Sequence, residues 1–188
     1  MKKILILSIL LITVAVLSAN DLLQTTLSNG MQIVVKENML NESVGFYCFV
    51  KTGSVNEGKY LGAGISHYLE HIVSSGATKF HTEDEYNEMG KEMGSIVNAY
   101  TTSGATAFYI TVDKTYKDMA LRNISQQLQF CLCDSFEVAR EQEVILKEIV
   151  MRSTPAHSKI YQRHNELVYP NSNKSYPVIG YTELYKTI

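Results

Sequence analysis

The spacing at which apolar residues recur changes along this chain, and that change limits the folds it can adopt. Residues 43–50 alternate as a β-strand does, with one face made of Val44, Phe46, Cys48 and Val50. From Thr115 onward the apolar residues recur at helical spacing. Strands and helices in local blocks, with no repeat or proline-rich linker between them, predict a single α+β domain with a largely antiparallel sheet packed with helices.

Turn and capping residues divide this pattern into elements. Asn29-Gly30 predicts a β-hairpin, and Ser103-Gly104 predicts the turn between two further strands. A helix is expected to start near Gly62 or Ala63, and a second to start at Thr82, where Glu85 completes a capping box. Later helices are expected over residues 115–132, 136–151 and 157–168.

The first residues have the composition of a targeting segment. Lys2 and Lys3 precede a mostly apolar run over residues 4–17, and small residues lead to Ala19. We therefore expect a signal peptide over residues 1–19, a mature domain over residues 20–188, and a periplasmic or secreted location. The alternative is a retained membrane anchor, although a bilayer span needs about 20 apolar residues and this run is shorter.

Charge and cysteine content restrict the partners and the redox chemistry. The chain has 17 basic and 19 acidic residues and no dense basic run, which argues against nucleic acid as a partner. Its three cysteines cannot all pair within one chain. Cys48 is expected to be a buried apolar residue, and the Cys131/Cys133 spacing fits neither a zinc knuckle nor a CxxC motif. The sequence assigns these cysteines no function.

The segment HYLEH, residues 67–71, carries the residues most suited to chemistry. His67 and His71 are four residues apart, so on a helix they project from one face and can bind one ion through neutral imidazoles. Glu70 borders that face and can accept a proton from a metal-bound water without being a ligand. Zinc suits such donors, but a catalytic zinc site needs a third protein ligand. The alternative is a solvated helix that carries two histidines.

Candidates for the third ligand lie in FEVAREQEVILKEIVM, residues 136–151. Glu141 and Glu148 are seven residues apart, so on a helix they lie on nearly the same side, next to apolar positions. A carboxylate that is buried there needs a cation or a hydrogen-bond donor. Other charged residues are expected to point to solvent, namely Arg140, Glu143 and Lys147. The alternative is a pair of glutamates on a solvated helix edge.

These residues resemble the inverted-motif zinc peptidases, a family that includes pitrilysin, insulin-degrading enzyme and the mitochondrial processing peptidases. In that family HxxEH is followed about 76 residues later by a glutamate ligand, and here residues 72–147 separate His71 from Glu148. NGMQIVVKEN, KTGSVNE and GSIVNAYT are similar to the family's opening hairpin, its loop before the motif and its substrate-pairing strand. The resemblance runs from about Leu27 to Gly180.

The resemblance implies a role for each matching residue. It makes His67, His71 and Glu148 the ligands of one Zn²⁺ ion, and it makes Glu70 the base that activates a zinc-bound water. Glu141 matches a glutamate that supports the site, and Asn98 and Ala99 match positions that contact substrate. The implied function is a zinc metalloendopeptidase domain that hydrolyses extended peptides or unfolded segments.

Two departures from the family pattern affect what this chain is expected to do. After the motif it reads IVSSGAT, with Ser74 and Ala77 where the family usually has a large apolar residue and part of a Gly-Thr pair. Family members work as two halves of two domains each, so this chain is expected to be the first, zinc-bearing domain, incomplete at its C-terminus. A second homologous half or subunit is the expected partner.

Three other interpretations fit parts of the sequence. The chain could be a non-catalytic subunit of a two-subunit peptidase, although such relatives lose motif residues that this chain retains. It could be a lyase of S-ribosylhomocysteine, but that class uses a cysteine as third ligand and works in the cytoplasm. Finally, it could be an inactive fragment of a real peptidase.

Overall fold

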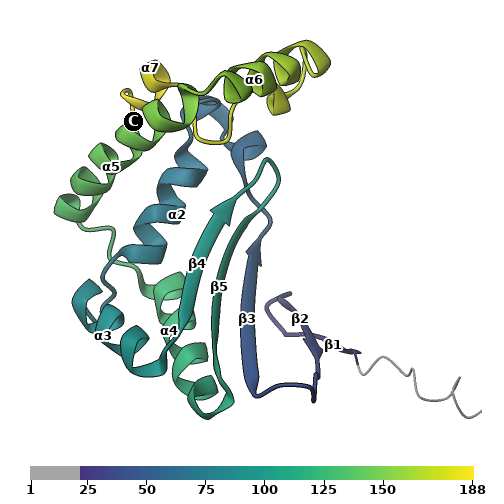
Figure 1. Cartoon of the computed structure of the whole chain (residues 1–188), viewed down its shortest axis with the longest axis vertical. Helices are drawn as coiled ribbons and strands as arrows, with labels where there is room; N and C mark the ends of the chain where they lie inside the picture. Colours follow the sequence, from purple (N-terminus) through teal and green to yellow (C-terminus); the bar gives the residue numbers. More distant parts are fainter. Residues whose placement is uncertain (1–21) are drawn as a thin grey trace, which may run out of the picture. The chain divides into compact units, whose positions relative to one another are not determined.

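The computed structural model describes residues 22–188, coloured along the chain in Figure 1. The expected signal peptide, residues 1–19, lies outside the described residues. The chain forms two compact units that divide after Glu42, and each is described by itself.

The first unit contains a β-hairpin. Strand β1 (Leu22–Thr26) pairs antiparallel with strand β2 (Gln32–Lys36). In the connecting turn Gly30 has a φ of 86°, a conformation that residues with a side chain rarely adopt. The side chain of Asn29 accepts the N–H of Met31 at 3.0 Å. The predicted hairpin around Asn29-Gly30 is therefore confirmed.

The second unit is built on a three-stranded antiparallel sheet. Its strands are β3 (Ser43–Val50), β4 (Ile96–Thr101) and β5 (Thr106–Asp113), in the order β3-β5-β4. All three coincide with predicted strands. Because β5 lies in the middle, β4 forms one edge of this sheet.

The helices follow the predicted pattern with small differences at their ends. They are α2 (Ile65–Ser75), α3 (Glu83–Met93), α4 (Lys117–Phe130), α5 (Ser135–Ser153), α6 (Ala156–Val168) and α7 (Thr182–Tyr185). Single 3₁₀ turns occupy Ser54–Asn56, Gly58–Tyr60, Lys114–Tyr116 and Asn173–Ser175. Thr82 caps α3 and forms the predicted capping box with Glu85. No described helix combines the length and the apolar character that a membrane crossing requires.

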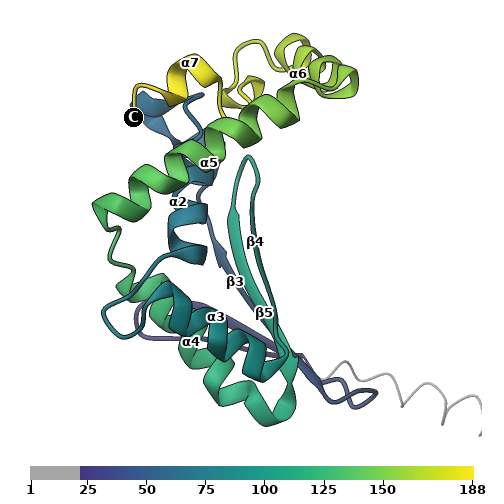
Figure 2. The ribbon, with the colours of Figure 1, turned by 60° about the vertical axis from the view of Figure 1, so that its left-hand side comes forward.

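Helices α2, α3 and α4 lie on the same side of the sheet, as the two views in Figures 1 and 2 show. Two clusters of buried residues form the core of this unit. The first joins the inner face of β5 to α3 and α4 through Met93, Phe108, Ile110, Val112, Ala120 and Ile124. The second joins α2, α5 and α7 through Tyr68, Ile72, Ile145, Ile149 and Tyr185. This arrangement confirms the predicted α+β fold.

The last part of the chain returns to the start of α2. The N–H of Tyr181 donates to the carbonyl of Gly62 at 2.8 Å, and the backbone of Ile179 and Gly180 lies close to that of Gly64. Gly64 has a φ of 74°, and a Cβ there would meet the Ile179 carbonyl. Tyr185 is fully buried against α2 and α5. The helix that carries HYLEH is thus held at its N-terminus by residues more than 110 positions later in the sequence.

Candidate metal centre

Helix α2 presents both motif histidines on the face that meets α5. The Nε2 atom of His67 lies 3.7 Å from Glu148 Oε2, and the Nε2 atom of His71 lies 3.4 Å from the same oxygen. One ligand atom from each of the three side chains lies within 4.8 Å of the other two. The two predicted histidine ligands on α2 and the predicted glutamate ligand on α5 therefore lie together in the structure.

The N-terminus of α2 is held by a carboxylate that sequence analysis did not single out. Glu57 accepts the N–H of Gly64 at 3.2 Å and the N–H of Ser66 at 2.9 Å. These N–H groups belong to the first turn, where a helix has unpaired donors and a partial positive charge. Glu57 therefore fixes the start of α2, at Ile65, two residues before His67.

Helix α5 is positioned by its own cap and by its apolar face. The Asp134 side chain accepts the N–H groups of Phe136 and Glu137. Ile145 and Ile149 are buried in the cluster shared with α2. Because Glu141 and Glu148 lie next to this stripe, both carboxylates face α2, and their side chains are 10% and 15% exposed. The solvated-edge interpretation is wrong for these two residues.

Burial determines the charge state of the innermost histidine. The His67 residue is 7% exposed, and burial, followed by the neighbouring His71, lowers the pKa of its imidazole to about 4. Its Nδ1 atom has no hydrogen-bond partner among the described residues. A neutral imidazole is the form that binds a metal.

The donor set fits a zinc ion. Two imidazole nitrogens and one carboxylate oxygen match the three protein ligands of catalytic zinc sites, which keep a fourth position for water or substrate. The second oxygen of Glu148 is held by Arg152, whose Nη2 atom lies 2.6 Å from Oε1. This ion pair leaves Oε2 directed at the two histidines.

Glu70 lies beside the three potential ligands and makes a different contact. It is 7% exposed, and its Oε2 atom accepts the hydroxyl of Thr101, on strand β4, at 2.5 Å. Burial raises the pKa of Glu70, and the hydrogen bond from Thr101 opposes that shift. A carboxylate with a raised pKa is better suited to accept and return a proton near neutral pH.

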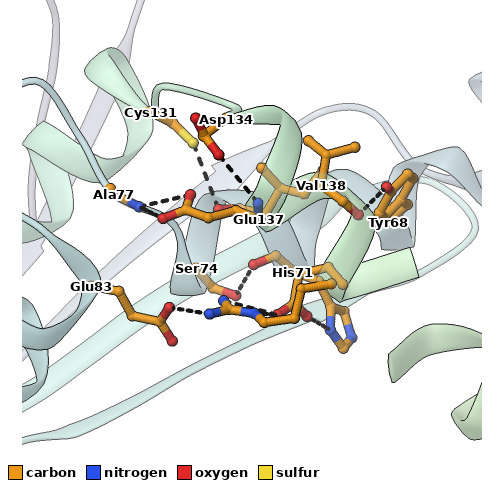
Figure 3. A network of polar contacts seen from close by, with 12 residues as sticks. Tyr68, His71, Ser74, Ala77, Glu83, Cys131, Asp134, Glu137 and Val138 are labelled. Carbon is orange, nitrogen blue, oxygen red and sulfur yellow. Dashed lines mark hydrogen bonds and ion pairs between the residues drawn. The ribbon is translucent and has the colours of Figure 1, made fainter. Parts of the chain in front are cut away.

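Glu141 contacts His71 from the side opposite Glu148. Its Oε2 atom lies 3.2 Å from His71 Nδ1, and this contact belongs to the network drawn in Figure 3. A carboxylate that accepts from one ring nitrogen directs the other nitrogen toward an ion. The geometry therefore suits Glu141 for orienting His71.

The expectation that Arg140 points to solvent holds in part: its side chain is 38% exposed, but its guanidinium also forms ion pairs. Its guanidinium lies 2.7 Å from Glu83 on α3 and 3.2 Å from Glu141. Helix periodicity places a residue on a face, but it does not reveal that another helix lies close to that face. Glu143 and Lys147 are exposed, as predicted.

Asn98 and Ala99 lie on β4 and are not members of the three-residue donor set. The Asn98 side chain accepts the N–H of Ala99 at 2.8 Å. With Glu70 and His71 they line a cavity of about 780 Å³ that α3 and α4 also border. The cavity thus connects the edge strand to the histidine cluster.

Comparison with known proteins identifies relatives of most of the chain. Residues 32–180 match the sequence profile described as insulinase (peptidase family M16). An uncharacterized zinc protease of Bacillus subtilis is 29% identical over 84% of this chain and 38% of its own length. One from Rickettsia felis is 30% identical over 82% of this chain and 37% of its own length. The mitochondrial-processing peptidase subunit beta of Dictyostelium discoideum is 26% identical over 87% of this chain and 34% of its own length.

Solved structures share the fold. A protease from Helicobacter pylori superposes with a TM-score of 0.83 at 23% identity, over 90% of this chain and 41% of the other. The periplasmic protease PqqL from Escherichia coli gives a TM-score of 0.78 at 23% identity, over 90% of this chain and 20% of the other. In sequence, the chain spans about two fifths or less of the relatives named above.

Proposed function

Because the chain belongs to the insulinase family of peptidases, peptidase family M16, we propose that it is the zinc-binding domain of a zinc-dependent endopeptidase. His67, His71 and Glu148 hold the ion, and residues 20–188 form the domain. The observation that carries this proposal is the approach of one atom from each of these side chains to within 4.8 Å of the others.

Each neighbouring residue has a role in the proposed hydrolysis. Bound zinc supplies a Lewis acid that polarises a peptide carbonyl and lowers the pKa of a coordinated water to about 7. The Glu70 carboxylate accepts the proton of the attacking water and passes it to the departing amine. Glu141 acts through His71 as a positioning residue. The alternative of a non-catalytic subunit has no contact in this site that favours it.

The edge strand suits an extended substrate. A peptide that pairs with β4 would use backbone hydrogen bonds, which depend little on sequence, and would pass Asn98 and Ala99. The cavity beside β4 gives side chains of that peptide room next to Glu70. We therefore propose extended peptides or unfolded segments as the substrate class, with Asn98 and Ala99 as contacts.

The proposed function includes export from the cytoplasm and assembly with a second half. The apolar run ahead of Ala19 supports export to the periplasm or the exterior, with residues 1–19 removed as a signal peptide. Relatives two to three times as long as this chain support a second homologous half or subunit as its partner.

The proposed function is tested by following hydrolysis of an unstructured fluorogenic peptide by the purified chain. We expect a chelator to abolish hydrolysis and added zinc to restore it. Zinc binding without hydrolysis would indicate that a second half is required. Hydrolysis that persists after complete removal of the metal would contradict the proposal.

Replacement of Thr101 tests how Glu70 is tuned. The Thr101 hydroxyl opposes the burial that raises the Glu70 pKa, so Thr101→Val should raise that pKa further. Because Glu70 must be ionised to accept a proton, the acidic limb of the kcat/KM profile should move to higher pH. Thr101→Ser keeps the hydroxyl and should keep the wild-type profile. Identical profiles for wild type and Thr101→Val would contradict this role.

A further inference from the structure

Two cysteines without a role in the proposed peptidase site lie close together between α4 and α5. The Sγ atoms of Cys131 and Cys133 are 3.8 Å apart. Cys131 is partly buried and Cys133 is exposed. The third cysteine, Cys48, belongs to strand β3.

The backbone around the pair is held in an uncommon conformation. Cys133 has a φ of 48°, and it is the one residue other than glycine with a positive φ among residues 22–188. Such a conformation is costly for a residue with a side chain and persists when its surroundings hold it. Asp134, the next residue, caps helix α5 and supplies part of that restraint.

The other side of the segment is anchored to the residues that follow α2. The N–H of Leu132 donates to the Ala77 carbonyl at 3.0 Å, and Cys131 forms an isolated bridge with Thr78. Figure 3 shows Cys131 beside Ala77 and Glu137 in this network. The two sulfurs are therefore held near each other by contacts on both sides.

We propose that Cys131 and Cys133 form a reversible disulfide within the chain, by exchange with a small-molecule disulfide such as oxidised glutathione. A disulfide requires sulfurs about 2.05 Å apart and Cα atoms about 4.4–6.8 Å apart. Residues two positions apart are separated by at most about 7 Å, so this range is accessible. Side-chain rotation then has to close the remaining gap from 3.8 Å.

The exchange proceeds in two balanced steps. The exposed Cys133 thiolate attacks one sulfur of the small disulfide, whose S–S bond breaks and releases one thiolate that takes up a proton. Cys131 then loses its proton and attacks the Cys133 sulfur, and the second small thiol leaves. The small disulfide is reduced to two thiols while the cysteine pair is oxidised. Burial raises the pKa of Cys131 to about 11, which leaves little Cys131 thiolate near neutral pH, so the first attack belongs to the exposed Cys133 and the second step should be faster at higher pH.

The bond should be easy to reduce. A disulfide that closes so short a loop removes little entropy from the unfolded chain, and a strained turn weakens it further. Strained or exposed disulfides are the labile ones. Export to an oxidising compartment would favour the oxidised form.

The pair is close to the proposed metal centre but does not contact it. Cys131 Sγ lies 3.6 Å from the Ile72 carbonyl, which also accepts the N–H of Gly76 at 2.8 Å. Loss of the weak sulfur contact leaves the stronger hydrogen bond in place. The redox state of the pair can therefore be measured independently of zinc binding and hydrolysis.

The test equilibrates the purified full chain with mixtures of oxidised and reduced glutathione. Free thiols are then alkylated after an acid quench, and the disulfides are mapped by mass spectrometry. We expect alkylatable thiols to fall from three to one per chain as the oxidised fraction rises, with a Cys131–Cys133 link that dithiothreitol reverses. Cys48→Ser should form the same link.

Two variants control for the fold at Cys133. Cys133→Ser removes the sulfur, and Cys133→Asn does so with a residue that tolerates positive φ. Neither should form a link within the chain. The proposal would be overturned if Cys133 in the wild-type chain carried glutathione at every ratio while Cys131 stayed alkylatable. A link from Cys131 to Cys48 or to a second chain would overturn it equally.

Discussion

Glu70→Gln is expected to abolish peptide hydrolysis while leaving zinc bound. Glutamine has the size of glutamate but cannot accept a proton, and general-base catalysis typically contributes a factor of about 10²–10⁴. Glu70 lies outside the group of three potential ligands, and Thr101 can still contact the new side chain. The measurement is kcat/KM on a fluorogenic peptide together with zinc content of the same sample.

Glu143→Gln is the matched control for this substitution. Glu143 is exposed on α5, so the same chemical change there should leave both hydrolysis and zinc content at wild-type values. A Glu70→Gln chain that retained wild-type kcat/KM would remove Glu70 from the role of base. Loss of zinc together with activity would make Glu70 part of the metal site instead.

Glu148→Gln is expected to weaken zinc binding by more than about 100-fold. The substitution removes the one carboxylate of the three-residue donor set and leaves two imidazoles, whereas loss of a supporting residue typically costs 10–100-fold. It also leaves Arg152 without its ion pair beside the site. Competition with a chromophoric chelator measures the affinity.

The zinc affinity of Glu141→Gln distinguishes a residue that orients a ligand from a residue that is itself a ligand. Glu141 contacts His71 Nδ1 and lies outside the three-residue donor set, so its loss should weaken zinc binding less than loss of Glu148 does. Glu143→Gln on the same helix should have no effect. Equal affinities for wild type and Glu148→Gln would exclude Glu148 as a ligand.

Periodicity and capping residues were sufficient to predict the elements that carry the site. The alternation over residues 43–50 predicted β3, and Thr82 with Glu85 predicted the start of α3. The start of α2 was predicted near Gly62, but it lies at Ile65 because Gly64 adopts a left-handed conformation against Ile179. That contact depends on residues far along the chain, which local patterns do not report.

The candidate site followed from spacing, but its surroundings did not. The i, i+4 spacing of the histidines and the resemblance to zinc peptidases indicated the three residues that meet in the structure. By contrast, Thr101 and Glu57 carry no sequence signal of their own, and each becomes relevant through a hydrogen bond of 2.5–3.2 Å. Arg152 follows Glu148 by four residues on the same helix, so the spacing could have indicated their ion pair, but not its place beside the histidines.

Cysteine positions illustrate the same limit. The alternation in β3 predicted that Cys48 is buried, whereas the structure shows it partly exposed. Cys131 and Cys133 matched no motif, yet their sulfurs lie 3.8 Å apart in a segment where Cys133 has a positive φ. Backbone conformation of that kind is not readable from residue types other than glycine and asparagine.

Zinc stoichiometry is the most direct test of the central claim that His67, His71 and Glu148 form a metal centre. Elemental analysis of the purified, folded chain should give one zinc ion per chain. His71→Ala should give none while retaining the helical circular dichroism of the wild type. A folded wild-type chain that binds no zinc, even after incubation with the ion, would contradict this claim. HYLEH would then be part of an ordinary helix that carries two histidines.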